Sequence, residues 1–181
     1  GAVVCTYLSG IADENDRCFL SGFPGPLRKL FGIWSEELDA LYDDERVSVE
    51  ASPDIDSGLT GKYEASIFCD LIHVEGAEIL ATYRSQFYAG RPAVTANHYG
   101  KGSAYYIASR NDDRFHEDLY GYLIDSLPLK RVLPCKLPVG VTAQWRTDGV
   151  NEFVFILNFT RVNQTVPLGA GRFIDMETDM I

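Results

Sequence analysis

The side chains best suited to chemistry lie in the run Asp13-Glu14-Asn15-Asp16-Arg17, where three carboxylates follow one another closely. Such carboxylates could bind Ca²⁺ or act as an acid and base pair. The run lacks, however, the ligand spacing and the glycine of a calcium-binding loop. Paired glycosidase carboxylates also face each other across a sugar cleft, roughly 5 to 9.5 Å apart, and nothing in the sequence builds that cleft. We therefore expect a structural or interface role for this loop.

Cys69 and His73 lie four residues apart in an extended run, so their side chains are expected on one face of a strand. A Cys–His pair could form an activated nucleophile, but the sequence shows neither a strained nucleophile turn nor a third orienting group. A buried thiol and an unrelated imidazole explain the spacing better. Cys5, the second candidate nucleophile, has no motif around it either.

Metal and cofactor motifs are also missing. His98 and His116 are isolated in the sequence, and three scattered histidines do not make a zinc site. The glycines of the run GKGSAYY follow neither the P-loop nor the dinucleotide pattern. We expect no catalytic residue, no bound cofactor and no metal ion in this chain.

The elements that position these residues begin with an apolar run at residues 3–7, typical of a buried strand. After the acidic loop, Pro26 suits a first helical turn, residues 27–31 have helical spacing, and Gly32 suits the left-handed residue that ends a helix. A second short helix or loop is expected at residues 35–42. Alternation then predicts a strand at residues 46–50, with Val47 and Val49 on one face.

Further strands are expected at residues 63–74, 78–83, 93–97 and 104–108, the last two being joined by a tight turn at residues 99–102. Asp112 and its neighbours are good N-cap types, and the apolar spacing that follows predicts a helix that ends near Leu127.

Three prolines between Pro128 and Pro138 predict a semi-rigid linker and a domain boundary. The expected division is 1–128, a linker at 129–138, and 139–181. Beyond the linker, residues 141–145 and 153–157 predict a hairpin with a turn at Asp148-Gly149, and residues 162–166 predict a further strand. Phe153 and Phe155 are expected to face inward, so this part reads as a small antiparallel β domain.

Composition limits the possible partners. The chain has 181 residues, with 26 acidic and 16 basic side chains and a net charge of −10. No basic cluster could neutralise phosphates, and no apolar stretch approaches the roughly 20 residues needed to span a bilayer. We expect neither nucleic acid nor membrane as a partner. The scattered cysteines favour reduced thiols and a bacterial cytoplasm.

Three runs carry a resemblance to a known family: SGIADEND, FPGPLRKLFGI and YAGRPAVTANHYGKGSAYYIAS. In this order and spacing they resemble the non-catalytic portion of glycoside hydrolase family 42, and residues 137–168 look like its terminal β domain. These β-galactosidases contain a catalytic barrel, a trimerisation domain and a small β domain. The resemblance implies an α/β, flavodoxin-like (class I glutamine amidotransferase-like) domain without its first βα units, followed by the antiparallel β domain.

The resemblance implies that the two catalytic glutamates lie in the barrel, which needs roughly 200 residues or more and is not here. The chain is therefore expected to be inactive alone, to serve subunit assembly as a C-terminal region of a homotrimer, and to meet galactosides only through its parent enzyme. Whether it self-associates weakly or stays monomeric is left open. The alternatives are an amidotransferase-like hydrolase with Cys69 or Cys5 as nucleophile, or a carbohydrate-binding module with Trp145, Tyr105 or Tyr106 as stacking platforms.

Overall fold

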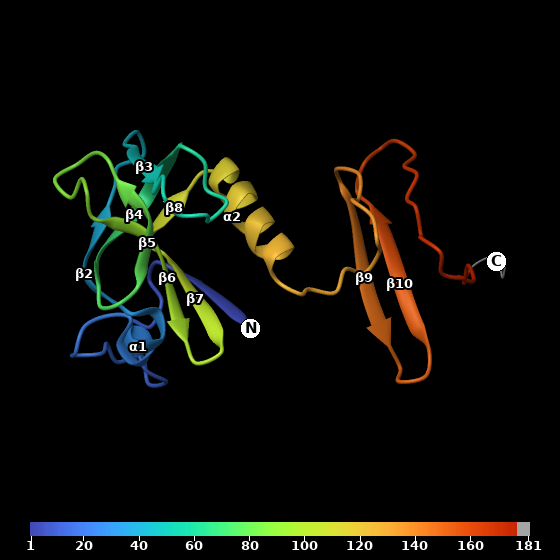
Figure 1. The fold of residues 1–181 in the computed structure, drawn as a ribbon, viewed down its shortest axis with the longest axis horizontal. Helices are drawn as coiled ribbons and strands as arrows, with labels where there is room; N and C mark the ends of the chain where they lie inside the picture. Colours follow the sequence, from blue (N-terminus) through green and yellow to red (C-terminus); the bar gives the residue numbers. More distant parts are fainter. Residues whose placement is uncertain (177–181) are drawn as a thin grey trace. The chain divides into compact units, whose positions relative to one another are not determined.

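The computed structural model describes residues 1–176 and divides the chain into two compact units, Gly1–Pro128 and Leu129–Ile181. The first unit holds a large sheet and both helices, and the second holds a two-stranded sheet (Figure 1). None of the helices within residues 1–176 is long and apolar enough to cross a membrane.

The sheet of the first unit has eight strands, of which seven follow the order β1-β7-β6-β5-β3-β4-β2 while β8 pairs with β4. β1 and β7 run parallel, and the other paired strands of this sheet are antiparallel. The strands are β1 (Ala2–Thr6), β2 (Ile33–Ala40), β3 (Val47–Ala51), β4 (Lys62–Val74), β5 (Glu78–Tyr83), β6 (Pro92–Tyr99), β7 (Gly102–Ile107) and β8 (Ser109–Asn111).

The long strand β4 connects different parts of this sheet. Its first residues pair with β3, and its second half pairs with β2. Between these parts Ile67 has a φ of 67°, and the register with β8 shifts between Ser66 and Cys69. A bulge of this kind bends a strand and increases its twist. β4 pairs with β2, β3 and β8 on either side of this bulge.

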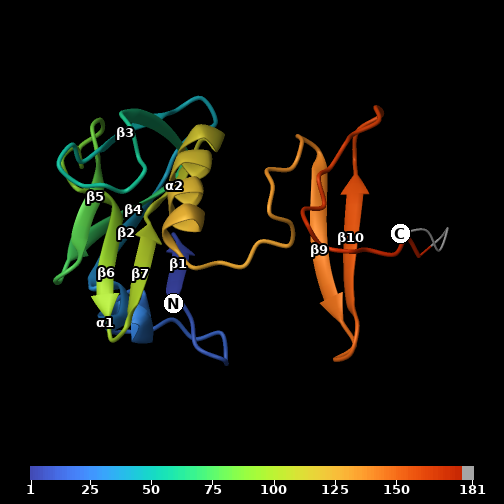
Figure 2. The same ribbon diagram turned by 45° about the vertical axis from the view of Figure 1, so that its right-hand side comes forward.

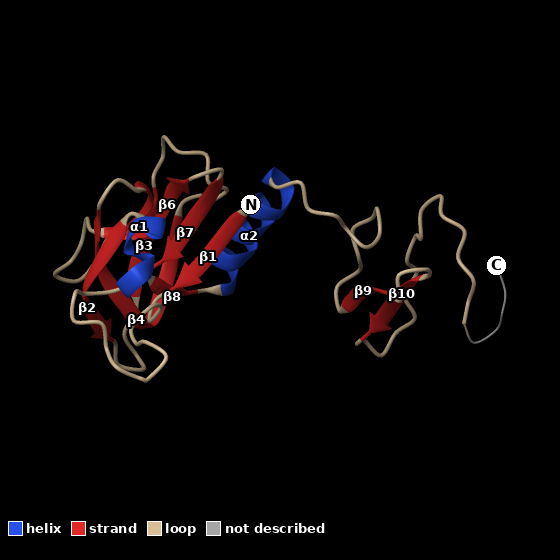
Figure 3. Cartoon of the chain, turned by 90° about the horizontal axis from the view of Figure 1, so that it is seen from below, coloured by secondary structure: helices blue, strands red, loops and turns tan. Residues whose placement is uncertain are grey.

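The two helices lie on opposite faces of the sheet. Tyr106 of β7 packs edge to face on Phe31 of α1 (Arg28–Phe31), whereas its neighbour Tyr105 interacts with Tyr122 of α2 (Asp113–Ser126). Successive strand residues point to opposite faces, so α1 covers one face and α2 the other. Figures 2 and 3 show α2 beside β1, at the edge of the sheet.

The core of the first unit is rich in aromatic side chains. Tyr63 packs edge to face on Phe115 with ring centroids 5.4 Å apart, and Tyr83 packs on Tyr88 at 5.0 Å. The hydroxyl groups of two of these rings have partners: Tyr63 donates to Asp118, and Tyr88 donates to Asp39. Phenol rings thus fill the core while their polar ends reach carboxylates near the surface.

The short helix after the acidic loop is confirmed. A 3₁₀ turn, η1 (Gly25–Leu27), with Pro26 in its first turn leads into α1, and Gly32 closes the helix with φ 60° and ψ 34°. The N-cap of α2 is also confirmed, since the Asp112 side chain accepts the N–H of Phe115 at 2.8 Å. Leu127 ends this helix, directly before Pro128.

Asp112 also joins this helix to the sheet, because its second oxygen accepts the N–H of Glu64 at 2.8 Å. Asp112→Ala is expected to lower the free energy of unfolding by about 1–2 kcal/mol through the lost cap, and by about 1 kcal/mol more through the strand N–H left unpaired. Urea unfolding measures the sum of these two losses of unfolding free energy. Asp113→Ala, at the exposed next residue, is the matched control, and equal losses in the two variants would contradict the double role of Asp112.

The expectation of a helix or loop at residues 35–42 is wrong, because residues 33–40 form β2. Acidic side chains such as Glu36 and Glu37 have weak strand propensity, but β2 pairs with β4 from Ile33 to Ala40. Pairing with a distant strand therefore overrides the local preference. The expectation of a buried first strand is also wrong: β1 is an edge strand whose side chains are exposed or half-buried.

The other expected strands of the first unit are confirmed as β3 to β7, whereas the short strand β8 was not predicted. Val47 and Val49 are both fully buried on one face of β3. β5 pairs with β6 as expected, but the connection spans residues 84–91, and Pro92 already belongs to β6. β6 pairs with β7 across the tight turn at Gly100. The expectation of an α/β domain is met in part, because the described residues of the first unit form mostly sheet with two α-helices. The flavodoxin-like arrangement stays a prediction.

In the second unit the predicted hairpin is confirmed, and the prediction of a third strand is wrong. β9 (Val141–Thr147) pairs with β10 (Glu152–Asn158) across the Asp148-Gly149 turn. Residues 162–166 form no strand, because Asn158 and Thr160 bond to the carbonyl of Val162 and fold the chain back locally. Phe153 is half-buried, but Phe155 is 47% exposed and does not face inward.

Candidate functional site

The acidic loop is a turn held together by its own side chain. Asp13 Oδ1 accepts the backbone N–H groups of Asn15 and Arg17, at 2.8 and 3.0 Å. The backbone also closes on itself, since Asp13 and Arg17 bond at 2.9 Å. One oxygen of this carboxylate is therefore already engaged in shaping the loop. Such bonding is typical of aspartate in turns and agrees with the expected structural role.

Cys69 and His73 do not form a pair. The Cys69 thiol is fully buried beside the Tyr83 and Tyr88 hydroxyls, whereas His73 Nε2 lies 2.7 Å from Glu36 on the half-exposed surface. Burial raises the pKa of Cys69 to about 11. A thiol with that pKa carries almost no thiolate at neutral pH, and the thiolate is the nucleophile. Its burial and its neutral form both argue against the amidotransferase-like alternative with Cys69 as nucleophile.

The other candidates also stay apart. Cys5 lies within β1, His98 near the end of β6, and His116 in the first turns of α2, stacked on Tyr120. Among residues 1–176, no three His, Cys, Asp or Glu side chains gather where they could hold a metal ion. All four cysteines are free thiols.

The three proposed stacking platforms differ in accessibility. Tyr106 is 1% exposed, so the expectation that it could stack on a sugar is wrong. Tyr105 is half-buried against α2. Trp145, in β9, is 45% exposed. Tyr105 belongs to the first unit and Trp145 to the second.

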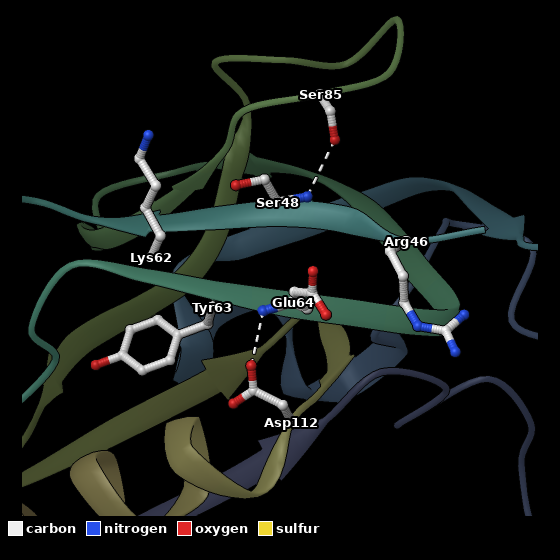
Figure 4. A pocket seen from close by; sticks show the side chains of 7 residues that line it. All are labelled: Arg46, Ser48, Lys62, Tyr63, Glu64, Ser85 and Asp112. Carbon is white, nitrogen blue, oxygen red and sulfur yellow. Dashed lines mark hydrogen bonds between the residues drawn. The ribbon is translucent and has the colours of Figure 1, made fainter. Parts of the chain in front are cut away.

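A shallow pocket opens beside β3 and β4, but several of its polar groups form hydrogen bonds within the fold. The Glu64 N–H donates to Asp112, and the Ser48 N–H donates to the Ser85 hydroxyl at 3.0 Å (Figure 4). Both oxygens of Asp112 are used within the fold. The lining residues are Arg46, Ser48, Lys62, Tyr63, Glu64, Ser85 and Asp112.

Sequence reasoning missed a cluster of charged and aromatic side chains on β2 and β4. Trp34 stacks on His73 with centroids 4.4 Å apart and planes 8° from parallel, and the Arg28 guanidinium lies 5.7 Å from the Trp34 ring. The bond from His73, followed by the bond from Arg91, lowers the pKa of Glu36. The cluster depends on the pairing of β2 with β4, which the sequence did not predict.

A second missed feature is a buried carboxylate. Asp70, on β4, is 4% exposed and accepts the Tyr106 hydroxyl at 2.6 Å. Its run of neighbours, Phe68 to Ile72, is apolar apart from this residue. A lone acidic residue within an apolar strand was the signal that could have revealed it, because buried charges are rare without a reason.

The first unit has a buried core and an edge strand, β1, which pairs only with β7. The candidate groups of the described residues do not converge into an acid–base pair, so the structure defines a class of non-catalytic domain. A family model, the β-galactosidase trimerisation domain of glycoside hydrolase family 42, matches residues 1–130. The chain belongs to this family and corresponds to a non-catalytic part of such enzymes.

Similar proteins agree with this assignment. The chain is 55% identical to a β-galactosidase of Clostridium perfringens over 98% of its length and 46% identical to one of Alicyclobacillus acidocaldarius over 96%. It spans about a quarter of the length of these relatives. The crystal structure of a cold-adapted β-galactosidase from Rahnella sp. R3 matches 93% of this chain and 25% of its own, with 54% identity and a TM-score of 0.85.

Proposed function

We propose that this chain is the assembly region of a β-galactosidase and holds its subunits together as a homotrimer. The observation that carries the proposal is the match of the trimerisation family to residues 1–130, which nearly coincide with the first compact unit. In such an assembly, binding energy positions neighbouring subunits and closed cyclic symmetry fixes their number.

The proposal assigns the chemistry to the rest of the parent enzyme, which would hydrolyse terminal non-reducing β-D-galactose residues. This is supported by the state of the candidate groups: Cys69 is a buried thiol, and the Asp13 carboxylate is engaged in its turn. A barrel with paired glutamates needs roughly 200 residues or more.

We further propose the division into a trimerisation-type domain at 1–128, a linker at 129–138 and a β domain at 139–181. The two compact units and the family match support it. The flavodoxin-like character is proposed for the edge at β1, because β1 and β7 form a parallel pair of the type from which such sheets are built. Free thiols and the bacterial relatives support a place in a bacterial cytoplasm.

Light scattering over a concentration series tests the assembly function. If this chain holds trimer contacts, the mass is expected to rise with concentration from 20.2 kDa towards three times that value. A limiting mass of two or four chains would overturn the trimer, and a monomer at every concentration would overturn the assignment of the contacts to this chain. Assayed in parallel, the chain should release no product from a chromogenic galactoside.

A further inference from the structure

The shallow pocket beside β3 and β4, which we call the β3–β4 pocket, contains polar groups that the fold does not use (Figure 4). It opens to solvent and has a volume of about 460 Å³. Small-molecule sites in proteins usually have volumes of about 300–1,000 Å³. The β3–β4 pocket is therefore large enough to hold a small molecule.

Strand pairing brings the side chains of the pocket together on one face of the sheet. Ser48 of β3 lies directly opposite Glu64 of β4, and Glu50 lies opposite Lys62. Side chains that are opposite each other in an antiparallel pair share a face, and alternate residues along a strand do so as well. Ser48, Lys62 and Glu64 therefore project from the same face. The Tyr63 side chain points to the other face and is 2% exposed.

The charged side chains around the pocket do not contact one another. Figure 4 shows Lys62 and Arg46 on opposite sides of Glu64. No hydrogen bond or ion pair of residues 1–176 includes the side chain of Lys62 or Glu64. By contrast, the neighbouring Glu50 is paired with Arg84, and Lys62 acts on it only by its charge. The carboxylate of Glu64 and the ammonium group of Lys62 can therefore bond to a ligand.

Other groups of the pocket are held in position by the fold. Arg46 donates from Nη1 to the carbonyl oxygens of Asp43 and Glu45, at 2.9 and 2.6 Å, so the rest of its guanidinium group can bond to a ligand. The Ser85 hydroxyl accepts the N–H of Ser48 at 3.0 Å, and its own hydrogen remains able to donate. A ligand would thus meet groups that are already oriented, which lowers the cost of binding.

We propose that the β3–β4 pocket binds a neutral molecule with several hydroxyl groups, of the size of a monosaccharide. The lining carries two cations, Arg46 and Lys62, and two carboxylates, Glu64 and Asp112. An anion would be repelled by the carboxylates, and a cation would be repelled by Arg46 and Lys62. A hydroxyl group both donates and accepts, so hydroxyl groups of one ligand can donate to Glu64 and accept from Lys62. The mixed charge of the lining thus favours a neutral polyol.

The affinity of the pocket is expected to be low. Tyr63 is the only aromatic residue of the lining, and its buried ring packs on Phe115 and so cannot stack on a ligand. The hydrogen bonds of an open pocket also replace bonds to water, which limits the net gain from each. We therefore expect a monosaccharide to bind with a dissociation constant of about 1–10 mM.

Nuclear magnetic resonance of the ¹⁵N-labelled chain, with D-galactose as the probe, tests the pocket. The backbone amide signals of Ser48, Glu64 and Ser85 are expected to shift together and to saturate with this dissociation constant. Sulfate is the anionic probe and methylammonium the cationic probe, and both are expected to bind more weakly than galactose. The proposal is overturned if galactose does not shift these signals, or if either ion shifts them with the same or a higher affinity.

A variant of the central carboxylate separates direct bonding from a general change in the chain. Glu64→Ala removes the acceptor but keeps the backbone N–H that donates to Asp112, so the contact between the sheet and α2 is retained. This variant is expected to bind galactose about tenfold more weakly. Glu37→Ala, at an exposed carboxylate of β2, is the matched control and should leave the affinity unchanged.

Equal affinities of the two variants for galactose would also overturn the proposal. The amide signals report on the pocket whether the chain is a monomer or a trimer, and light scattering measures that assembly separately. A failure of the polyol site is therefore distinguishable from a failure of the assembly function.

Discussion

Phe115→Ala is expected to lower the free energy of unfolding of the first unit by about 3–5 kcal/mol. Phe115 is fully buried where α2 meets the sheet, and its ring packs at 88° on the ring of Tyr63. The truncation removes apolar area and leaves a cavity between elements that are fixed by other contacts, among them the bond from Tyr63 to Asp118. Because domains have a total unfolding free energy of only about 5–15 kcal/mol, this one substitution would remove a large part of the stability.

Urea unfolding followed by circular dichroism measures this effect. Tyr120→Ala is the matched control, because it removes a ring of similar size from the same helix at a position that is 37% exposed. The control is expected to cost no more than about 1 kcal/mol. An equal loss of unfolding free energy in the two variants would show that the buried face of α2 does not hold the helix on the sheet.

Gly10→Ala is expected to have the second largest effect. Gly10 has a φ of 64°, and a β-carbon added there would lie 2.2 Å from the carbonyl oxygen of Pro24. That carbonyl cannot move freely, because it accepts the N–H of Leu27 at the start of α1. The variant combines a left-handed conformation, which costs about 1–2 kcal/mol, with overpacking, which costs about 1–3 kcal/mol more.

Gly22→Ala isolates the cost of the left-handed conformation from the cost of overpacking. Gly22 has a φ of 87°, but a β-carbon at this position meets nothing within 4 Å. Thermal or urea unfolding of the two variants should therefore show a larger loss for Gly10→Ala, by about the overpacking cost. Equal losses would mean that the contact between Gly10 and Pro24 contributes nothing.

Elements defined by local chemistry could be predicted from the sequence. Pro26 and Gly32 delimit the short helix, Asp112 begins the long one, and the Asp148-Gly149 turn joins the second-unit hairpin. Each of these signals acts within a few residues, through a fixed φ or a side chain that bonds a nearby N–H. Such local interactions can be predicted without knowing which distant residues contact the segment.

The errors share a different cause. Residues 33–40 form a strand because β4 pairs with them, and residues 2–6 form an edge strand because β7 alone pairs with them. Residues 162–166 alternate like a strand but have no strand to pair with. Strand pairing is non-local, so a window of sequence does not contain the information that decides it.

The same distinction separates the parts of the candidate site. A structural or interface role was predicted for the acidic loop, and in the structure Asp13 holds that loop by accepting the N–H groups of Asn15 and Arg17. The pairing of Trp34 with His73 and the burial of Asp70 against Tyr106 were not predicted, because each joins residues from strands far apart in the chain. The sequence favoured an unpaired Cys69 and His73, and the structure confirms this, because Cys69 is buried and His73 lies beside Glu36.

The pairing of β1 with β7 imposes an order on folding. Ala2 lies opposite Ser103, so β1 meets its partner only after most of the first unit has been synthesised. Contacts this distant along the chain carry a large loop-closure cost and slow the folding reaction. Until then β1 presents an unsatisfied edge to the cell, and chaperones or neighbouring chains compete with β7 for it.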